Sequence, residues 1–363
     1  MIASVLFASL LAQSPDPATS PEYIGNCLSQ TIDFSDTSRI FDMGGLPTLT
    51  DIKGLDVSRY DMTMDYNSQN IKIIPGSGVR LDLTPNKAGG DPVGTRMSST
   101  RFMQYGKVSA VLKAPAVSGI VITFISMGPQ LPDPNVDLSY VDPSGGDEID
   151  WELLGSDPLH AESNIFYRGI PEYGIRSGTH PLSNNITEFH KYTIDWKHDL
   201  INFLIDDQLV RTYYKNSTLA TDSRSATEQF FPNRAGKFQI SIWSQASNTW
   251  AGGAAKFANG VDSYSAYYKS IEVECYDSND TVVPKWPNSA SNPDKLPSIP
   301  NQPTAVFNGV IPKTAAPGFV GPITSQYDGY GNLITIAQTS FSNVSSYGAA
   351  SLLTFALILL LSL

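Results

Sequence analysis

The stretch GGDEIDWELLG, residues 145–155, decides the fold class, because acidic and apolar side chains alternate strictly along it. On a β-strand this alternation places Glu148, Asp150 and Glu152 on one face and the apolar residues on the other. The apolar face packs inward, which leaves three carboxylates in a row where like charges repel one another. Stability alone would not select such a row, so the strand also indicates a functional site.

The chain between Cys27 and Cys275 shows this two-residue period far more often than a helical period. The clearest strands are 79–83, 106–113, 192–196 and the continuously apolar segment 120–127, which is typical of a strand buried on both faces. Residues 201–210 predict a hairpin whose tight polar turn is Asp206-Asp207-Gln208. Many short strands in about 250 residues predict an all-β fold, a β-sandwich of the jelly-roll kind.

The composition limits the function classes that the chain can belong to. It has 363 residues, 41% of them hydrophobic, which is enough for one large core. With 24 Lys and Arg against 35 Asp and Glu, its formal net charge is −11, so no positive field attracts nucleic acid or anionic lipid. Only 16% of the residues are charged, whereas Ser, Thr, Asn and Gln are abundant, which is more typical of secreted proteins than of cytosolic enzymes.

The first residues indicate export. Residues 1–12 are apolar apart from two serines and precede a polar break, as in a secretory signal peptide; a frayed apolar N-terminus is the alternative. In an oxidising compartment Cys27 and Cys275 could be joined, and two buried thiols are the alternative. Glycosylation sequons begin at Asn185, Asn216, Asn279 and Asn343, although such triplets often arise by chance.

The last residues indicate a lipid anchor. Residues 352–361 are apolar but shorter than a membrane span, and a polar spacer and a small triplet that begins at Asn343 precede them. This pattern predicts a glycosylphosphatidylinositol (GPI) anchor attached at Asn343, with residues 344–363 removed; a tail-anchored helix is the alternative. Residues 277–343 are rich in Pro, Ser, Asn and Thr, and we expect an extended stalk there.

The outer carboxylates of the row are spaced for cleavage of a glycosidic bond. At ~3.3 Å per residue the Cα atoms of Glu148 and Glu152 lie about 13 Å apart, and side chains that lean together can bring the carboxyl groups to about 5 Å. That separation suits a retaining glycosidase, in which one carboxylate attacks the anomeric carbon and the other acts as acid and then as base. Asp150 can hydrogen-bond the nucleophile and help keep the acid protonated. A solvated acidic edge strand and a calcium site are the alternatives.

Other candidate groups are weaker. Four aromatic residues could stack on sugar rings, although each alone is more often a core residue: Tyr105, Phe166, Trp243 and Trp250. The four histidines lack metal-binding spacing and are expected to be surface or structural residues: His160, His180, His190 and His198. No phosphate-binding loop and no G-x-S-x-G motif is present, so we expect neither a metal nor another cofactor.

The segment DEIDWELLG, residues 147–155, resembles the active-site strand of glycoside hydrolase family 16, specifically its fungal Crh-like branch of cell-wall transglycosylases. The resemblance covers roughly residues 30–275 and includes further blocks in the family's order, namely 105–127, 164–166, 189–212, 242–243 and 250–253. It implies a concanavalin-like jelly-roll with a concave glycan cleft, a catalytic domain at residues 27–276, and transfer of chitin fragments onto β-glucan with retention.

The resemblance also implies roles for single residues. Glu148 would be the nucleophile, Asp150 its helper and Glu152 the acid/base. Trp243 corresponds to a sugar-contacting tryptophan, and Trp250 begins a block that lines the cleft. The other substrate-binding candidates are Tyr105, Asn164, Phe166, Gln239 and Ser247.

Two other functions remain open at this point. One is an endo-β-glucanase that uses water as its acceptor, and the other is an inactive lectin-like or structural wall protein. A degenerate relative is expected to have lost Glu148 or Glu152, so the presence of all three carboxylates argues against the inactive protein. The resemblance implies a monomer at the cell surface or in the wall, with polysaccharide partners and a membrane link only through its lipid.

Overall fold

A computed structural model describes residues 26–42, 59–128, 147–167, 174–217 and 229–286 in full, and the backbone of 52–53, 305–306, 324–327 and 333–336. The chain divides into two units, Met1–Thr314 and Ala315–Leu363. Residues 1–12, Asn343 and residues 344–363 lie outside the described residues, so the signal peptide and the anchor stay predictions.

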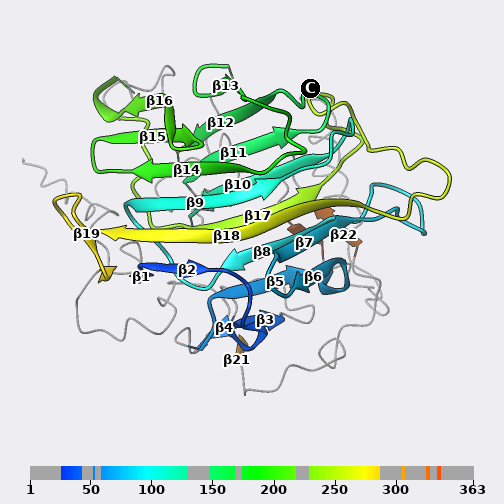
Figure 1. The fold of residues 1–363 in the computed structure, drawn as a ribbon, viewed down its shortest axis with the longest axis horizontal. Coiled ribbons are helices and arrows are strands. Elements are labelled where there is room, and N and C mark those ends of the chain that lie inside the picture. Colours follow the sequence, from blue (N-terminus) through cyan, green and yellow to red (C-terminus); the bar gives the residue numbers. More distant parts are fainter. Residues whose placement is uncertain are drawn as a thin grey trace, which may run out of the picture. The chain divides into compact units, whose positions relative to one another are not determined.

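The first unit is built on two large sheets (Figure 1). The β11 sheet has the strand order β13-β12-β11-β10-β17-β8-β5-β3. Its strands are β3 (Ile40–Asp42), β5 (Met62–Tyr66), β8 (Thr95–Ser99), β10 (Val121–Met127), β11 (Glu148–Leu154), β12 (His160–Phe166), β13 (Gly178–Pro181) and β17 (Lys237–Trp243). All of its neighbouring strands are antiparallel except β3 and β5.

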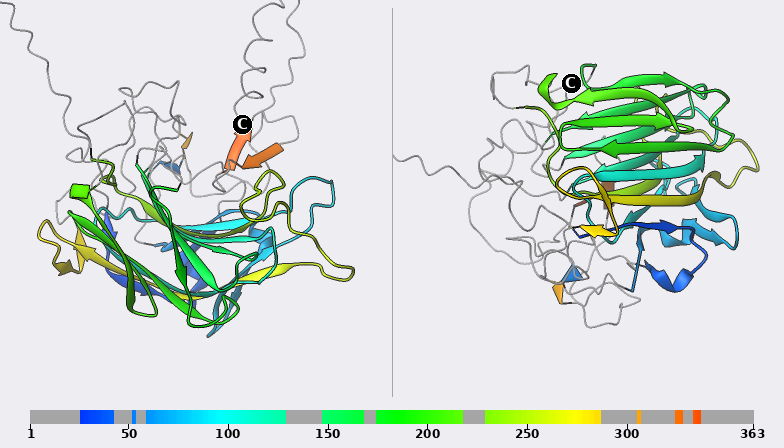
Figure 2. Two further views of the ribbon diagram at one scale, coloured as in Figure 1. Left: turned by 90° about the horizontal axis from the view of Figure 1, so that it is seen from above. Right: turned by 60° about the vertical axis from the view of Figure 1, so that its left-hand side comes forward.

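The β14 sheet has the order β16-β15-β14-β9-β18-β7-β6, and β2 and β19 also pair with β18. Its strands are β2 (Gln30–Ile32), β6 (Ile71–Ile74), β7 (Gly78–Leu83), β9 (Gly106–Lys113), β14 (His190–Trp196), β15 (Leu200–Ile205), β16 (Gln208–Tyr214), β18 (Tyr264–Tyr276) and β19 (Val282–Val283). The two sheets lie in separate layers (Figure 2).

One hydrophobic core fills the space between the sheets. It takes alternate residues from both layers, such as Ile122 and Phe124 of β10 and Ile194 of β14. Polar groups also cross it: the buried Tyr268 hydroxyl of β18 donates to the backbone carbonyl of Thr123 in β10 at 2.9 Å. This arrangement confirms the predicted all-β sandwich, because a strand that is apolar on alternate positions can bury that face only against a second layer.

The strands predicted from alternation are present as β7, β9, β10 and β14, and all seven residues of β10 are buried. The predicted hairpin joins β15 and β16. Its turn is Asp206-Asp207, with φ of 50° and 63°, as a type I′ turn requires. Gln208 already belongs to β16, so the turn is one residue shorter than predicted.

A disulfide joins Cys27 to Cys275, with Cα atoms 5.8 Å apart. Cys27 lies in β1 (Cys27–Leu28), which pairs with β20 (Lys285–Trp286), while β19 pairs with the end of β18. Strand pairing therefore continues to Trp286, beyond residue 276 where the catalytic domain is predicted to end. This pairing of residues 277–286 cannot be recognised from sequence, because short edge strands bury few side chains and therefore show no apolar pattern.

Two further strand pairs involve the predicted stalk, residues 277–343. Within the first unit, β21 (Ala305–Val306) pairs in parallel with β4 (Ile52–Lys53). In the second unit, β22 (Thr324–Tyr327) and β23 (Leu333–Ile336) form an antiparallel hairpin. Across the described residues, no helix has the length and apolar character needed to cross a membrane.

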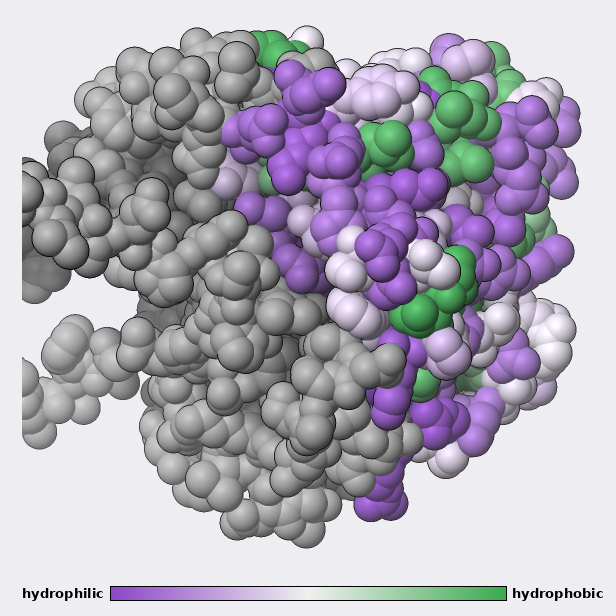
Figure 3. All heavy atoms as spheres, turned by 90° about the vertical axis from the view of Figure 1, so that its left-hand side faces the viewer, coloured by the Kyte–Doolittle hydropathy of each residue, from purple (hydrophilic) through white to green (hydrophobic). Residues whose placement is uncertain are grey.

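The described surface shows no extended apolar area on the face in Figure 3, where hydrophilic residues predominate and hydrophobic ones form small separate groups.

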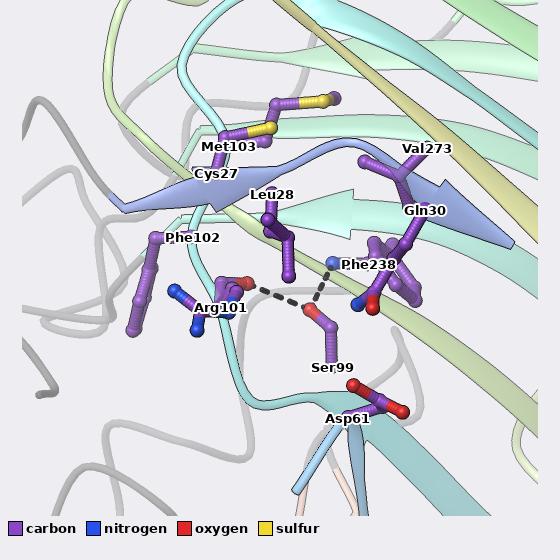
Figure 4. Close-up of a pocket in the computed structure, with 10 residues that line it drawn as sticks. All are labelled: Cys27, Leu28, Gln30, Asp61, Ser99, Arg101, Phe102, Met103, Phe238 and Val273. Carbon is purple, nitrogen blue, oxygen red and sulfur yellow. Dashed lines mark hydrogen bonds between the residues drawn. The ribbon is translucent and has the colours of Figure 1, made fainter. Parts of the chain in front are cut away.

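A small cavity of about 10 Å³ lies near the disulfide, lined by Cys27, Ser99 and Phe238 among others (Figure 4). The Ser99 hydroxyl beside it accepts from the Phe238 backbone N–H at 3.1 Å and donates to the Arg101 carbonyl at 2.8 Å. This cavity has room for about one water molecule.

Candidate active site

Strand β11 carries the three predicted carboxylates, and its packing fixes the direction in which they point. All seven of its residues pair with β10 and five pair with β12. Ile149, Trp151 and Leu153 belong to the core. The Trp151 indole N–H also donates to the carbonyl of Thr193 in β14 at 3.0 Å. Because the apolar side chains are held in the core, the acidic side chains lie on the opposite face.

We name this opposite face the carboxylate face. It comprises Glu148, Asp150 and Glu152 and the residues beside them on the neighbouring strands, since directly paired residues share a face. Those residues are Glu162, Asn164 and Phe166 on β12, Thr123, Ile125 and Met127 on β10, and Ser241, Gln239 and Lys237 on β17. The hydroxyls of Thr123 and Ser241 hydrogen-bond each other at 2.5 Å, so the middle of the face is ordered and polar.

Asp150 is the most deeply buried carboxyl of the row, with 1% of its surface exposed. Burial raises its pKa well above the ordinary value, and the charges of Glu148 and Glu152 raise it further. Both Asp150 carboxyl oxygens are buried without a hydrogen-bond partner among the described residues. Burial and the two neighbouring carboxyls therefore favour the protonated form of Asp150, which can donate a hydrogen bond to an adjacent carboxylate.

Glu152 lies at the more accessible end of the row. It is partly buried, whereas Glu148 is buried with 8% of its surface exposed. Burial, followed by the charges of Glu148 and Glu162, raises the pKa of Glu152 to about 8. A carboxyl with that pKa holds its proton at neutral pH and can deliver it to a leaving group. The row thus contains one carboxyl suited to acid catalysis, with Glu148 on the far side of Asp150.

Three further polar atoms near the row are buried and have no hydrogen-bond partner in the part of the chain that the structure describes, namely Asn164 Oδ1, Gln239 Oε1 and Trp243 Nε1. Asn164 and Gln239 lie in the same cross-strand row as Asp150. The Trp243 ring packs with Val121, Leu154 and Ala251 in a small cluster apart from the main core. Buried polar atoms normally have partners, so these two acceptors and one donor suit a ligand rich in hydroxyl groups.

The remaining predicted substrate contacts divide into two groups. Phe166 lies directly opposite Glu148 on β12, and Trp250 is 43% exposed and donates its indole N–H to Glu162 Oε2 at 3.2 Å. Ser247 is exposed in the loop between β17 and β18. Tyr105 does not join the site: it precedes β9 in the other sheet, belongs to the core, and packs its ring on Trp196 and His198.

Glu162 is not among the residues predicted from sequence, although the structure places it directly opposite Glu152. A signal was present in HAESNIF, residues 160–166, where Glu162, Asn164 and Phe166 fall on one face of a strand. That signal is weak, because the other positions of this strand include Ser163 and are not uniformly apolar. Only the pairing of β12 with β11 shows that the two strands share one polar face.

The four histidines each have a local hydrogen-bond partner: His160 with Asp157, His180 with Ser163, His190 with Asp206 and His198 with Asp280. Burial and the nearby charge of Arg211 lower the pKa of His180 to about 4, so it is neutral. Within the fully described ranges, no cluster of His, Cys, Asp and Glu is placed to hold a metal ion.

Among the sequons, Asn216 and Asn279 are exposed and Asn185 is partly exposed.

Comparison with known proteins agrees with this geometry. Residues 58–259, more than half of the chain, match the model of the glycosyl hydrolases family 16. The chain belongs to this family. The matched range contains β11 and every residue of the carboxylate face, and the predicted membership of glycoside hydrolase family 16 is confirmed.

Similar proteins occur in fungi. Crh-like protein 2 of Aspergillus fumigatus is 31% identical over 198 residues, which are 51% of this chain and 40% of that protein. Congo red hypersensitive protein 2 of Saccharomyces cerevisiae is 30% identical over 196 residues, 51% of this chain and 38% of that protein. The matched part of this chain therefore spans about two fifths of the length of these relatives.

Among solved structures, the Crh5 transglycosylase in complex with NAG is similar in fold. Its TM-score is 0.50 at 22% sequence identity, and the match covers 71% of this chain and 88% of that chain. This likeness supports the two-layer β architecture described above.

Proposed function

We propose that this chain is a retaining glycosidase of the fungal cell wall that acts as a transglycosylase, cleaving chitin or another β-linked glycan and transferring the fragment to β-glucan. The row on β11 carries the proposal: Asp150 is buried between two further carboxyls, and burial and neighbouring charge raise the pKa of Glu152 to about 8. The names of the similar proteins, Crh-like protein and Crh5 transglycosylase, support transfer rather than simple hydrolysis.

In the first step the Glu148 carboxylate attacks the anomeric carbon, and the bond to the leaving oxygen breaks as Glu152 gives that oxygen its proton. A covalent glycosyl-enzyme and an ionised Glu152 result. In the second step Glu152 takes the proton of the acceptor hydroxyl, whose oxygen attacks the anomeric carbon and releases Glu148. A protonated Asp150 can donate a hydrogen bond to Glu148 and steady its charge before attack and after release.

Substrate binding falls to polar and aromatic groups on the same face. The amide oxygens of Asn164 and Gln239 can accept from sugar hydroxyls, and the Trp243 indole N–H can donate to one. The exposed Trp250 offers a ring for the apolar face of a sugar unit, and Phe166 lies buried opposite Glu148. An acceptor held by such contacts can compete with ~55 M water, because oriented groups reach effective molarities of about 10⁵ M or more. The chemistry requires no cofactor.

Carboxylate variants test the division of roles. Glu148→Gln should abolish cleavage and transfer, because no covalent intermediate can form. Glu152→Gln should abolish cleavage of chitin oligosaccharides, yet retain cleavage of an activated donor and regain turnover with azide, because only proton transfer is missing. Glu272→Gln, on the β14 sheet, is the matched control and should keep wild-type rates.

Product analysis with chitin oligosaccharides and a labelled glucan acceptor separates transfer from hydrolysis. Labelled products larger than the acceptor are expected. If wild-type protein gives only hydrolysis products at millimolar acceptor, the transglycosylase assignment fails and an endo-acting hydrolase remains. Normal rates of Glu152→Gln on unactivated glycan would refute the role of Glu152.

The same proposal places the protein outside the cell. We infer export by the signal peptide at residues 1–12, N-glycosylation at Asn185, Asn216 and Asn279, and a GPI anchor at Asn343. The part of the predicted stalk beyond residue 306 would carry a monomeric catalytic domain away from the membrane, to which only the lipid is attached. The apolar composition of the two ends and the exposure of Asn216 and Asn279 support this placement.

A further inference from the structure

Glu162 is a fourth carboxyl on the carboxylate face, and the mechanism above gives it no role. It lies directly opposite Glu152 in the antiparallel pair of β11 and β12. The Cβ atoms of such a pair are about 4.5–5.5 Å apart, and like charges placed this way destabilise a sheet. A neutral residue at position 162 would avoid the repulsion, so the charge there calls for a functional explanation.

The Glu162 side chain is held by an aromatic residue from another part of the chain. The Trp250 indole N–H donates to Glu162 Oε2 at 3.2 Å. Trp250 belongs to the β17–β18 loop, which is itself fixed: the Gly119 N–H donates to the Ala251 carbonyl at 2.7 Å. The bond therefore connects a positioned loop to β12 at the point where β12 borders Glu152.

We propose that Glu162 is a positioning residue for the acid/base step: fixed by the Trp250 indole, its carboxylate keeps Glu152 protonated until the leaving oxygen takes the proton. This inference rests on the proposed function, because it assigns Glu152 as the acid. Glu162 forms no bond with substrate in this role and acts through the electrostatic field at Glu152 alone.

The charges around Glu152 agree with this assignment. Its own strand contributes Glu148 and the protonated Asp150, and β12 contributes Glu162. The residue opposite it on β10 is Thr123, which is uncharged, and the next along the row on β17 is Ser241. Farther along that row, the Arg96 guanidinium of β8 donates to Asp65 at 2.8 Å, so the charge of this cation is partnered within the sheet.

The electrostatic causes point in the same direction. Burial raises the pKa of Glu152 the most, the charge of Glu148 raises it further, and the charge of Glu162 adds to both. Burial also raises the pKa of Glu162 itself, and the charge of Asp157 adds to this, whereas the Trp250 hydrogen bond and His160 lower it. The indole thus favours the ionised form of Glu162, which is the form that holds the proton on Glu152.

Glu162→Gln is the decisive variant, because the amide keeps an oxygen for the Trp250 indole and removes only the charge. With unactivated polysaccharide, the basic limb of its pH–rate profile should move to lower pH, while the rate near pH 5 stays within about twofold of wild type. With an activated aryl glycoside, whose leaving group needs no proton, the cleavage rate should be unchanged at all pH values. Trp250→Phe should move the limb in the same direction by less.

A second measurement does not depend on turnover. In protein labelled with carboxyl ¹³C glutamate, the resonance that is absent from Glu152→Gln belongs to Glu152, and its titration should move to lower pH in Glu162→Gln. Glu272→Gln, which removes one carboxylate charge from the other sheet, should leave the titration of Glu152 unchanged. An unmoved titration, or equal rate losses on both donors at every pH, would overturn the inference. If wild-type protein cleaves no glycan, the proposed function fails while the titration still decides the role of Glu162.

Discussion

Replacing Glu152 with Gln should stabilise the folded protein, and the gain should grow with pH. A carboxyl whose pKa is raised by folding binds its proton more tightly in the folded state than in the unfolded state. The folded protein therefore loses stability as the pH rises from the ordinary value of 4.5 to about 8. Below this interval the carboxyl is protonated in both states and the loss is absent, whereas above it the loss is complete. An amide has nearly the same shape as a carboxyl but does not ionise, so Glu152→Gln avoids this loss of stability.

The magnitude follows from the same interval. From 4.5 to about 8, at about 1.4 kcal/mol per pH unit, the full effect is about 5 kcal/mol. Glu152 is only partly buried, so water screens part of the interaction and the expected gain above pH 8 is about 1–3 kcal/mol. A gain of this sign is expected where activity requires a strained group of charges.

Urea unfolding of wild type and Glu152→Gln at pH 4, 6 and 8.5 measures this difference, provided that the m-values agree. The two proteins should be equally stable at pH 4, and the variant should be the more stable at pH 8.5. Glu272→Gln is the matched control, because it removes a carboxylate whose partner is Lys191, at 3.2 Å, and should bring no gain. The reasoning is refuted if Glu152→Gln is less stable than wild type at pH 8.5, or if the difference does not change with pH.

Two other predictions concern the ends of the catalytic domain. Replacing Cys27 and Cys275 together with Ala should lower the free energy of unfolding by about 5 kcal/mol in the chain-entropy model, because the disulfide closes a loop of 248 residues; a loss under about 1 kcal/mol in urea unfolding would contradict this. Deleting residues 344–363 should release active enzyme into the medium, because the anchor signal is missing. Retention of the truncated protein on cells, together with no release of the full-length protein by a phospholipase, would argue against the anchor.

The central strands can be predicted from sequence because burial dictates their composition. All residues of β10 are buried, and alternate residues of β11 are in the core, so their patterns are apolar throughout or strictly alternating. The outermost pairs cannot be predicted in this way. The strand β20, Lys285–Trp286, is partly exposed, so its composition does not identify it as a strand. It pairs with β1, where Cys27 lies opposite Trp286.

The site was predictable to the extent that one strand determines it. Alternation alone places Glu148, Asp150 and Glu152 on a common face, whereas the neighbours of that face depend on which strands pair with β11. Glu162 was missed for this reason. Composition cannot separate Tyr105 from a sugar-binding residue, because aromatic residues fill cores and bind sugars alike. Its position directly before β9 and its ring contacts with Trp196 and His198 place it in the other layer, and composition alone reveals neither fact.

The register of β11 links the stability of the sandwich to the placement of its carboxylates. A slip of one residue would turn every side chain to the opposite face, so Asp150 and its acidic neighbours would enter the core while Trp151 left it. Burying carboxylates among apolar groups costs several kcal/mol each, and Trp151 would lose its bond to Thr193. The paired residues on β10 and β12 hold the strand in its one register. The apolar half of the strand therefore supplies the free energy that keeps three mutually repelling carboxyl groups side by side.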